Sequence, residues 1–280
     1  MKHDKVSFWL YVLHRMLRNN TILLQMAGQT DRGRVRDHNE DYIFFDASLG
    51  LAVLADGMGG YNAGEVASEI ATQTISKGMR RAVEKEDVPY LEGAVDPEDG
   101  LMYATTLLRK QIILANRKVY EASINEPDCE GMGTTVVAAV LCADRFAVAH
   151  VGDSRAYRCR NGALRQLTRD HSLLQEQIDH AEWQADRASE FPRKNLVTRA
   201  LGADRHVQVD IAEFDALPDD VFLLCSDGLT DMLSLDRIND IVAETRSVSL
   251  DDAAVRLIEE ANQQGGRDNI SVILLKIPES

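Results

Sequence analysis

The sequence repeatedly ends an apolar run on an aspartate. "LAVLAD" ends on Asp56, "FAVAHVGD" on Asp153 and "VFLLCSD" on Asp227, while Asp268 comes just before the apolar run "ISVILL". Apolar runs of this length with glycine beside them are typical of buried strands. The pattern therefore predicts a β-rich core whose strands carry carboxylates at their ends.

Two further carboxylates extend this set, because Glu40 and Asp41 open the apolar run "YIFF". For any single aspartate beside a glycine, a turn is the more ordinary explanation. The recurrence favours a shared role. If the carboxylates converge, two unit charges about 4 Å apart at an effective dielectric near 20 repel by about 4 kcal/mol. A cluster of this kind needs protons or cations.

Carboxylates, backbone carbonyls and water are the usual ligands of Mg²⁺, Mn²⁺ and Ca²⁺. Gly57 lets the backbone approach closely enough for its carbonyl oxygen to join them. We therefore predict an oxygen-ligand site for two or more cations on a β scaffold. Two such ions activate water and clamp the oxygens of an in-line displacement, which suits the hydrolysis of phosphate esters.

Arg36 is the candidate that holds the phosphate, because a planar guanidinium binds two phosphate oxygens at once. It lies shortly before Glu40 in "RVRDHNED". A surface pair with Asp37 or Asp41 is an equally good interpretation of its position.

The order of elements argues for antiparallel sheets with helices packed outside. The pattern does not alternate regularly between strand and helix, which disfavours a doubly wound parallel sheet. Asn161-Gly162 predicts a two-residue hairpin turn. We expect strands over 21–30, 41–47, 51–56, 134–142, 145–153, 154–160, 163–168, 206–214, 221–227 and 269–277, and helices over 62–83, 101–124, part of 171–195 and 250–263.

Composition narrows the classes of partner. The formal net charge of −14 argues against a nucleic-acid-binding surface and is compatible with divalent cations or basic partner segments, although simple solubility explains much of it. The cysteines Cys129, Cys142, Cys159 and Cys225 show no metal-binding spacing. A reducing, cytoplasmic location fits them best.

Residues 1–23 are expected to form an N-terminal extension, either helical or disordered. The apolar run "VSFWLYVL" is too short to span a bilayer, and no small-residue cleavage site of a signal peptide follows it. We expect no transmembrane segment. A weak membrane-surface role and a translation start at Met26 stay open.

The motifs "RDHNED", "LADGMGG", "GMGTT", "HVGDSRAY", "LTRDHS", "LCSDGLTD" and "GGRDNISVI" occur in this order. Together they resemble the metal-dependent serine/threonine protein phosphatases of the 2C class (the PPM family), in the bacterial type. The resemblance spans about residues 24–276. It implies an α+β fold: a four-layer α-β-β-α sandwich with two central antiparallel β-sheets flanked by helix pairs.

The resemblance also implies a binuclear Mn²⁺ or Mg²⁺ centre at one end of the sandwich. By motif, Asp56 bridges the two ions and Gly57 contributes its carbonyl oxygen. Asp227 and Asp268 hold one ion. Bacterial members often bind a third ion, for which Asp153 together with Asp227 would be the ligands.

The remaining roles follow from the same resemblance. Glu40 and Asp41 act on or through metal-bound waters, and Arg36 grips the substrate phosphate; Arg36, Asp56 and Asp41 are the catalytic candidates. A hydroxide bridging the ions attacks phosphoserine or phosphothreonine directly, without a phosphoenzyme. The catalytic domain would cover 24–280, with a flap over 171–198.

Met58 departs from the eukaryotic pattern "DGHGG", in which the histidine is thought to protonate the leaving alkoxide. Methionine is only a weak acceptor and cannot donate a proton. A metal-bound water is the favoured substitute, and His38 and His171 are the side-chain candidates. Each histidine is more readily explained as an ordinary loop or packing residue. Arg199 is left without a role.

The leading hypothesis is a protein-serine/threonine phosphatase that opposes a serine/threonine kinase. Its partner would be a phosphorylated protein, either the kinase or one of its targets, and we expect a cytoplasmic monomer that does not bind nucleic acid. The alternatives are a phosphoprotein-binding pseudophosphatase and a small-molecule phosphomonoesterase. The sequence has no P-loop and no kinase lysine motif.

Overall fold

The computed structural model describes residues 24–60, 63–84, 94–96, 100–180, 191 and 196–278. The expected N-terminal extension, 1–23, and half of the expected flap, 171–198, lie outside these residues. Among the described helices, none combines the length and apolar character needed to cross a bilayer.

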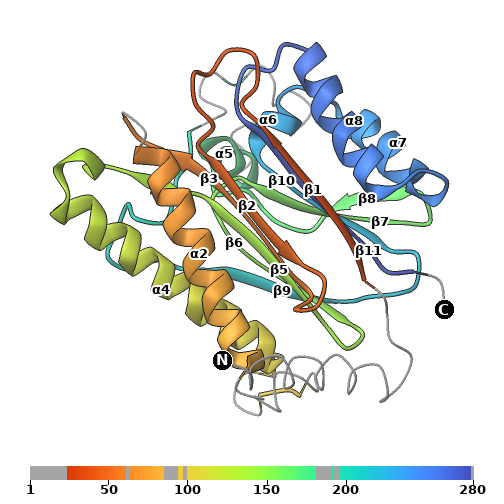
Figure 1. Ribbon diagram of the computed structural model, residues 1–280, viewed down its shortest axis with the longest axis horizontal. Coiled ribbons are helices and arrows are strands. Elements are labelled where there is room, and N and C mark those ends of the chain that lie inside the picture. The colour runs from red at the N-terminus through yellow and green to blue at the C-terminus, as the bar shows by residue number, and fades with distance from the viewer. Residues whose placement is uncertain are drawn as a thin grey trace, which may run out of the picture.

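Two antiparallel sheets lie face to face at the centre of the molecule (Figure 1). The first has the order β1-β11-β10-β7-β8, with bounds Gln25–Asp31, Ile270–Lys276, Val221–Cys225, Arg155–Arg160 and Ala163–Gln166. The second has the order β2-β3-β5-β6-β9, with bounds Asp41–Asp46, Leu51–Met58, Val136–Cys142, Arg145–Val151 and Asp210–Asp215, and β4 (Gly133–Thr134) pairs with the end of β3.

Helices cover the outer face of each sheet (Figure 1). The pair α2 (Ala63–Glu84) and α4 (Tyr103–Asn125) packs on the second sheet. The pair α7 (Leu235–Ala243) and α8 (Leu250–Gln263) packs on the first sheet. The short helix α5 (Leu173–Asp179) lies between β8 and β9, and α6 (Asp227–Thr230) lies between β10 and α7. Two 3₁₀ turns span Pro127–Cys129 and Glu244–Arg246. The predicted four-layer sandwich is confirmed.

This layering explains why the central strands are apolar on both faces. In β3, Leu51 and Val53 face the helix pair α2/α4, while Ala52 and Leu54 face the opposite sheet. Successive side chains of a strand point to opposite faces, so a strand covered on both sides needs a continuous apolar run. A run without alternation therefore marks an inner strand of the sandwich.

Local signals set most element boundaries as predicted. The helix expected over 101–124 is α4, whose Leu108, Ile112, Ala115 and Val119 are all buried. The predicted hairpin turn is also present. Asn161 and the glycine after it have φ of 55° and 78°, which suits a two-residue turn between β7 and β8.

Two boundaries and one helix differ from the sequence predictions. The strand expected over 206–214 begins only at Asp210, and in the described part of 21–30 the strand begins at Gln25. Helix α7 was not predicted from the pattern. It is short, and it follows Ser234, whose hydroxyl accepts a hydrogen bond from the Arg237 amide at its first turn. Its few buried apolar positions give too weak a periodic signal.

Candidate metal centre

The strand ends that carry carboxylates meet at one end of the sandwich, where α6 lies (Figure 1). Asp41 and Asp56 stand directly opposite each other in the pairing of β2 with β3. Asp227 follows β10, and Asp268 precedes β11, its antiparallel neighbour. Asp153 comes shortly after β6, in the other sheet. Antiparallel pairing puts the start of one strand beside the end of the next, which is why residues far apart in sequence converge here.

Burial and mutual repulsion act together on these carboxylates. Burial raises the pKa of Asp56 well above its usual value, and the charges of Asp41, Asp227 and Asp153 raise it further. Burial likewise raises the pKa of Asp227, with Asp153 and Asp268 adding to the effect. The cluster predicted from the strand ends is therefore a real concentration of negative charge.

Burial and neighbouring charge also raise the pKa values of Asp41 and Asp153. Burial is the main cause that raises the pKa of Asp41 to about 6 and that of Asp153 to about 6. A neighbouring carboxylate adds to each shift, Asp268 for Asp41 and Asp170 for Asp153. Buried and half-buried carboxylates gathered this densely need cations to stay ionised.

The donor atoms present fit a hard divalent cation. Oδ2 of Asp41 accepts a hydrogen bond from Ser226 Oγ at 2.9 Å, while its Oδ1 is buried without a hydrogen-bond partner among the described residues. A buried carboxylate oxygen left without a partner is costly unless an ion takes that place. Because the cluster offers oxygen ligands alone, Mn²⁺ and Mg²⁺ suit it better than soft metals.

Gly57 lies where the end of β3 passes very close to the start of α2. A Cβ atom on this residue would lie 2.0 Å from the carbonyl oxygen of Gly64, so only glycine fits. The Gly57 amide donates to the carbonyl of Glu40 at 3.1 Å. The Asp56 carbonyl accepts from the Thr135 amide at 2.8 Å. Both sides of the Asp56-Gly57 peptide are therefore held firmly.

Arg36 reaches the same end of the molecule. Its Nη2 lies 2.6 Å from Oδ2 of Asp268, so the structure pairs it with Asp268 rather than with Asp37 or Asp41. The Arg36 side chain is 49% exposed, which leaves donors open to a ligand from solvent. Glu40 lies close by, and burial raises the pKa of its carboxyl group while the Arg36 charge lowers it.

Asn269 is a structural residue of the site that sequence reasoning missed. Its Oδ1 accepts from the Glu40 amide at 2.8 Å, and its Nδ2 donates to the carbonyls of Arg32 and His38 at 3.0 and 2.9 Å. It therefore ties the loop that carries Arg36 to the start of β11. The available signal in the sequence was an amide side chain directly after Asp268, at the start of the apolar run "ISVILL".

Of the two histidine candidates for a side-chain acid, His38 is exposed on the loop before β2 and His171 is buried. Met58 ends β3 and pairs with Gly133 of β4. His171 is buried, and its Nδ1 accepts a hydrogen bond from the Gly152 amide at 3.0 Å. Its Nε2 faces a carboxylate of Asp210 at 3.3 Å. Both ring nitrogens of His171 are thus engaged in structural contacts, which favours the packing interpretation over a catalytic one.

Comparison with known proteins agrees with this geometry. The family model described as "Protein phosphatase 2C" matches residues 29–263. The chain is 39% identical over 251 residues to the serine/threonine phosphatase stp of Listeria welshimeri, covering 89% of this chain and 94% of that protein.

Solved structures give the same result. The crystal structure of the Mycobacterium tuberculosis serine/threonine phosphatase PstP/Ppp superposes with a TM-score of 0.79 at 33% identity, covering 91% of this chain and 99% of that one. The catalytic domain of PstP in complex with two manganese ions gives a TM-score of 0.76 at 32% identity, with coverage of 91% and 99%. This chain therefore belongs to the protein phosphatase 2C family.

Proposed function

We propose that this protein hydrolyses phosphoserine and phosphothreonine in proteins, using two Mn²⁺ or Mg²⁺ ions. The observation that carries the proposal is the set of buried and half-buried carboxylates that five separate chain segments bring to one end of the sandwich, where neighbouring carboxylates raise the pKa of Asp41, Asp56 and Asp227. The names of the relatives and the two manganese ions of the PstP catalytic domain support it.

We assign the ion ligands by the motifs that this chain shares with the protein phosphatase 2C family. Asp56, whose pKa is raised by the charges of Asp41, Asp227, Asp153 and Asp268, is proposed to bridge two ions. Asp227 and Asp268 would complete one ion's shell, and the Gly57 carbonyl the other. Asp153 with Asp227 would hold a third ion. Glu40 and Asp41 would orient waters in the shell.

When bound, the ions supply Lewis-acid chemistry: they activate a water nucleophile and neutralise the phosphoryl charge. The protein supplies the rest. Arg36, half exposed beside Asp268, binds the phosphate oxygens and fixes the ester in line. The strand ends hold the ligands rigidly, because Asp41 and Asp56 are fixed by the β2–β3 ladder. Ser226 restrains the Asp41 carboxylate through its hydroxyl.

The test is release of inorganic phosphate from a phosphothreonine peptide in the presence of Mn²⁺. A matched phosphotyrosine peptide and p-nitrophenyl phosphate serve as comparison substrates. Hydrolysis of the phosphothreonine peptide at a higher kcat/KM than either comparison supports the proposal. Binding of the peptide without phosphate release would indicate a pseudophosphatase, and preference for the small ester a phosphomonoesterase.

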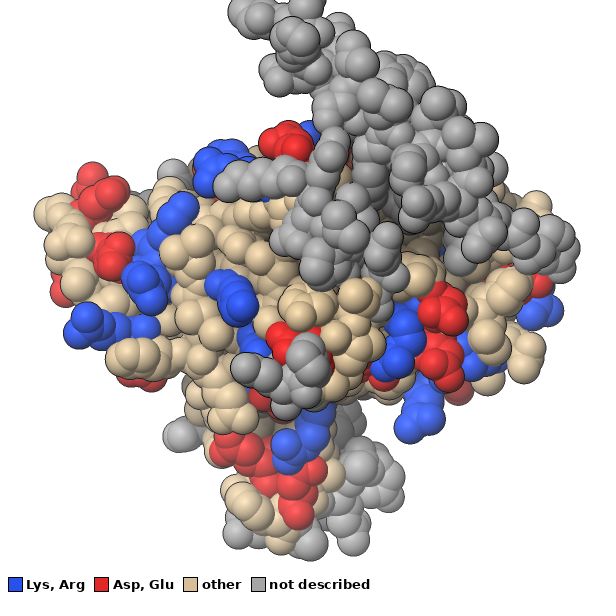
Figure 2. Space-filling model, turned by 90° about the horizontal axis from the view of Figure 1, so that it is seen from below, with Lys and Arg blue, Asp and Glu red and all other residues tan. Residues whose placement is uncertain are grey.

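We further propose a cytoplasmic monomer with a catalytic domain over 24–280 that acts against a serine/threonine kinase. The partner is a phosphorylated protein, not a nucleic acid. On the face seen from below, described Lys and Arg side chains are scattered among Asp and Glu rather than gathered into one basic surface (Figure 2). The net charge of −14 points the same way.

Arg36→Ala is expected to raise KM for the phosphothreonine peptide by about 10- to 100-fold, because a charge-assisted hydrogen bond is worth about 1.5–3 kcal/mol. Arg36→Lys should recover only part of the loss, since lysine cannot bind two oxygens at once. Steady-state kinetics measure both. The matched control is Arg80→Ala, which breaks the Arg80–Asp46 pair at the opposite end of β2. An unchanged KM in Arg36→Ala would refute the phosphate-binding role.

A further inference from the structure

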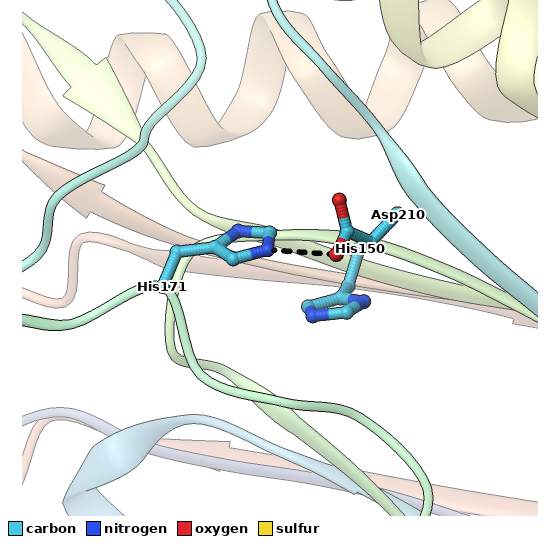
Figure 3. Close-up of side chains that lie close together, drawn as sticks. All are labelled: His150, His171 and Asp210. Atoms are coloured by element: carbon cyan, nitrogen blue, oxygen red, sulfur yellow. Dashed lines mark ion pairs between the residues drawn. The ribbon is translucent and has the colours of Figure 1, made fainter. Parts of the chain in front are cut away.

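A second group of polar side chains lies beside the acidic cluster, and the proposed reaction gives it no role. His150 on β6 pairs across the sheet with Asp210 on β9. The ring of His171, from the loop before α5, stacks on that of His150 with centroids 4.7 Å apart. Figure 3 shows the His171 ring directing its edge at the Asp210 carboxylate, with the His150 ring beside both. Arg199 joins them, with Nη1 2.7 Å from Oδ1 of Asp210.

The hydrogen bonds fix the proton positions. A backbone amide can only donate, so Nδ1 of His171 accepts from Gly152 N–H, and in the neutral ring the proton is on Nε2. That proton faces Oδ2 of Asp210, which lies 3.3 Å from Nε2. Nε2 of His171 and Nη1 of Arg199 lie 3.0 Å apart because both donate to the same carboxylate, one to each oxygen.

His150 is held in the same way. Its Nε2 lies 2.8 Å from the carbonyl oxygen of Arg169, which can only accept, so Nε2 carries the proton. Burial lowers the pKa of both histidines. Burial alone would raise the pKa of Asp210, but the hydrogen bonds from Arg199 and His171 outweigh it and lower that pKa. The arrangement is therefore two neutral rings beside one Asp–Arg ion pair.

A metal site is the competing explanation. One ligand atom from each of His150, His171 and Asp210 lies within 4.8 Å of the others, and two imidazoles with a carboxylate suit Zn²⁺. Two features oppose it. The Arg199 guanidinium already neutralises Asp210, and a cation there would face it. For a metal to bind Nε2 of His171, the proton would have to move to Nδ1, where Gly152 donates.

The group is connected to the acidic cluster through Gly152. This glycine exchanges two hydrogen bonds with His171: its amide donates to Nδ1 and its carbonyl accepts from the His171 amide, both at 3.0 Å. Its φ is +108°, and a Cβ here would lie 2.6 Å from Cβ of Thr135. Thr135 Oγ1 in turn accepts from the Asp56 amide at 3.2 Å. Gly152 is thus held between His171 and a residue that restrains Asp56, and the next residue is Asp153.

We propose that His171, oriented by Asp210 and Arg199, is a positioning residue that fixes the Gly152–Asp153 turn through the Gly152 amide and so sets the place of the Asp153 carboxylate. The inference rests on the proposed function, because it concerns the cation site to which Asp153 belongs. His171 touches neither the substrate nor the ions; it acts through the backbone. The one remaining backbone bond between His171 and Gly152 lets the loop persist when the side chain is changed.

Two substitutions at His171 separate its two hydrogen bonds. In His171→Asn the side-chain oxygen takes the place of Nδ1 and still accepts from Gly152. In His171→Gln the amide reaches the place of Nε2 but leaves the Gly152 amide without its acceptor. We expect His171→Gln to weaken Mn²⁺ binding at the Asp153 site by about 10-fold, as for other residues that orient a ligand, while His171→Asn stays close to wild type. Calorimetric Mn²⁺ titration measures this.

The readout that needs no metal is the Gly152 amide. Its hydrogen exchange, followed by NMR, should speed up in His171→Gln but not in His171→Asn. Long-range ¹H–¹⁵N spectra should show His171 protonated at Nε2. The control for general destabilisation is Asp220→Asn, because Asp220 is a buried partner of Arg160 at the end of β10 away from Asp227. It should leave Mn²⁺ binding unchanged.

The outcomes are distinct. If wild type binds Mn²⁺ and His171→Gln binds it equally well, the inference is wrong and the proposed function stands. If wild type binds no Mn²⁺, the proposed function is wrong. Independently of metal, equal hydrogen exchange of the Gly152 amide in wild type and His171→Gln would refute the inference. Displacement of the His171 Nε2 proton by Zn²⁺ would show a metal site instead and overturn the positioning role.

Discussion

Asp56→Asn is expected to lower kcat for the phosphothreonine peptide by at least about 100-fold. Replacing a residue that merely orients a metal ligand costs about 10- to 100-fold in metal affinity or activity, so losing the central ligand should cost at least the upper value. Asparagine keeps the shape of the side chain and its backbone contacts, and removes the charge that faces Asp41, Asp227 and Asp153. Steady-state kinetics with Mn²⁺ measure the loss.

The same substitution has the opposite effect on the stability of the metal-free protein. The folded state raises the pKa of Asp56 through burial and neighbouring charges, so the ionised form is disfavoured in the folded protein relative to the unfolded chain. At neutral pH this destabilises the fold, and a neutral asparagine removes the penalty. We expect Tm in chelator to rise by about 2–4 °C for each kcal/mol gained.

A matched control uses the other end of β2. Asp46→Asn changes an aspartate that hydrogen-bonds to Ser48 and pairs with Arg80, far along the strand from Asp41. It should leave kcat unchanged and should not raise Tm. A variant Asp56→Asn that keeps wild-type kcat, or that lowers Tm in chelator as much as an ordinary buried-polar substitution, would contradict the central role of Asp56.

Most strands and helices of the fold could be predicted from the sequence, because the patterns that mark them are local. An inner strand such as β5 is apolar throughout, since it is covered by helices on one side and a sheet on the other. Helix α8 was predicted with its observed bounds, and Ser249 caps it by accepting from the Asp252 amide. Helix α7, with only Ile238, Ile241 and Val242 buried, was missed because so few positions give no clear period.

The residues of the candidate site could be predicted from the sequence, but the contacts between them could not. That strands end in carboxylates is visible in the sequence, but their convergence depends on β1 pairing with β11 across nearly the whole chain. The partner of Arg36 is Asp268, 232 residues away, and neither residue's neighbours indicate the other. His150 and Asp210 meet only because β6 pairs with β9. Patterns in a single sequence indicate which residues share a face or an end of a strand or helix. The pairing of strands far apart in the sequence decides which of these faces and ends come into contact.

Removal of divalent metal is expected to abolish activity, and its addition to stabilise the fold. Because the carboxylates repel one another when buried, ions bind the folded chain much better than the unfolded one. Each site filled at 100 times its Kd contributes about 2.7 kcal/mol. For a chain of this size that corresponds to a rise in Tm of roughly 5–10 °C per site.

The measurement is a thermal melt in chelator and at rising Mn²⁺ concentration, paired with phosphate release under the same conditions. Asp56→Asn is the internal control: its Tm should start higher in chelator and respond less to Mn²⁺, because the charge that attracts the ions is smaller. Mg²⁺ should act in the same direction as Mn²⁺, since both are hard cations that take oxygen ligands. Wild-type activity that persists in excess chelator would refute the two-metal proposal. A wild-type Tm that does not move at millimolar Mn²⁺ would mean that the buried carboxylates bind no ion.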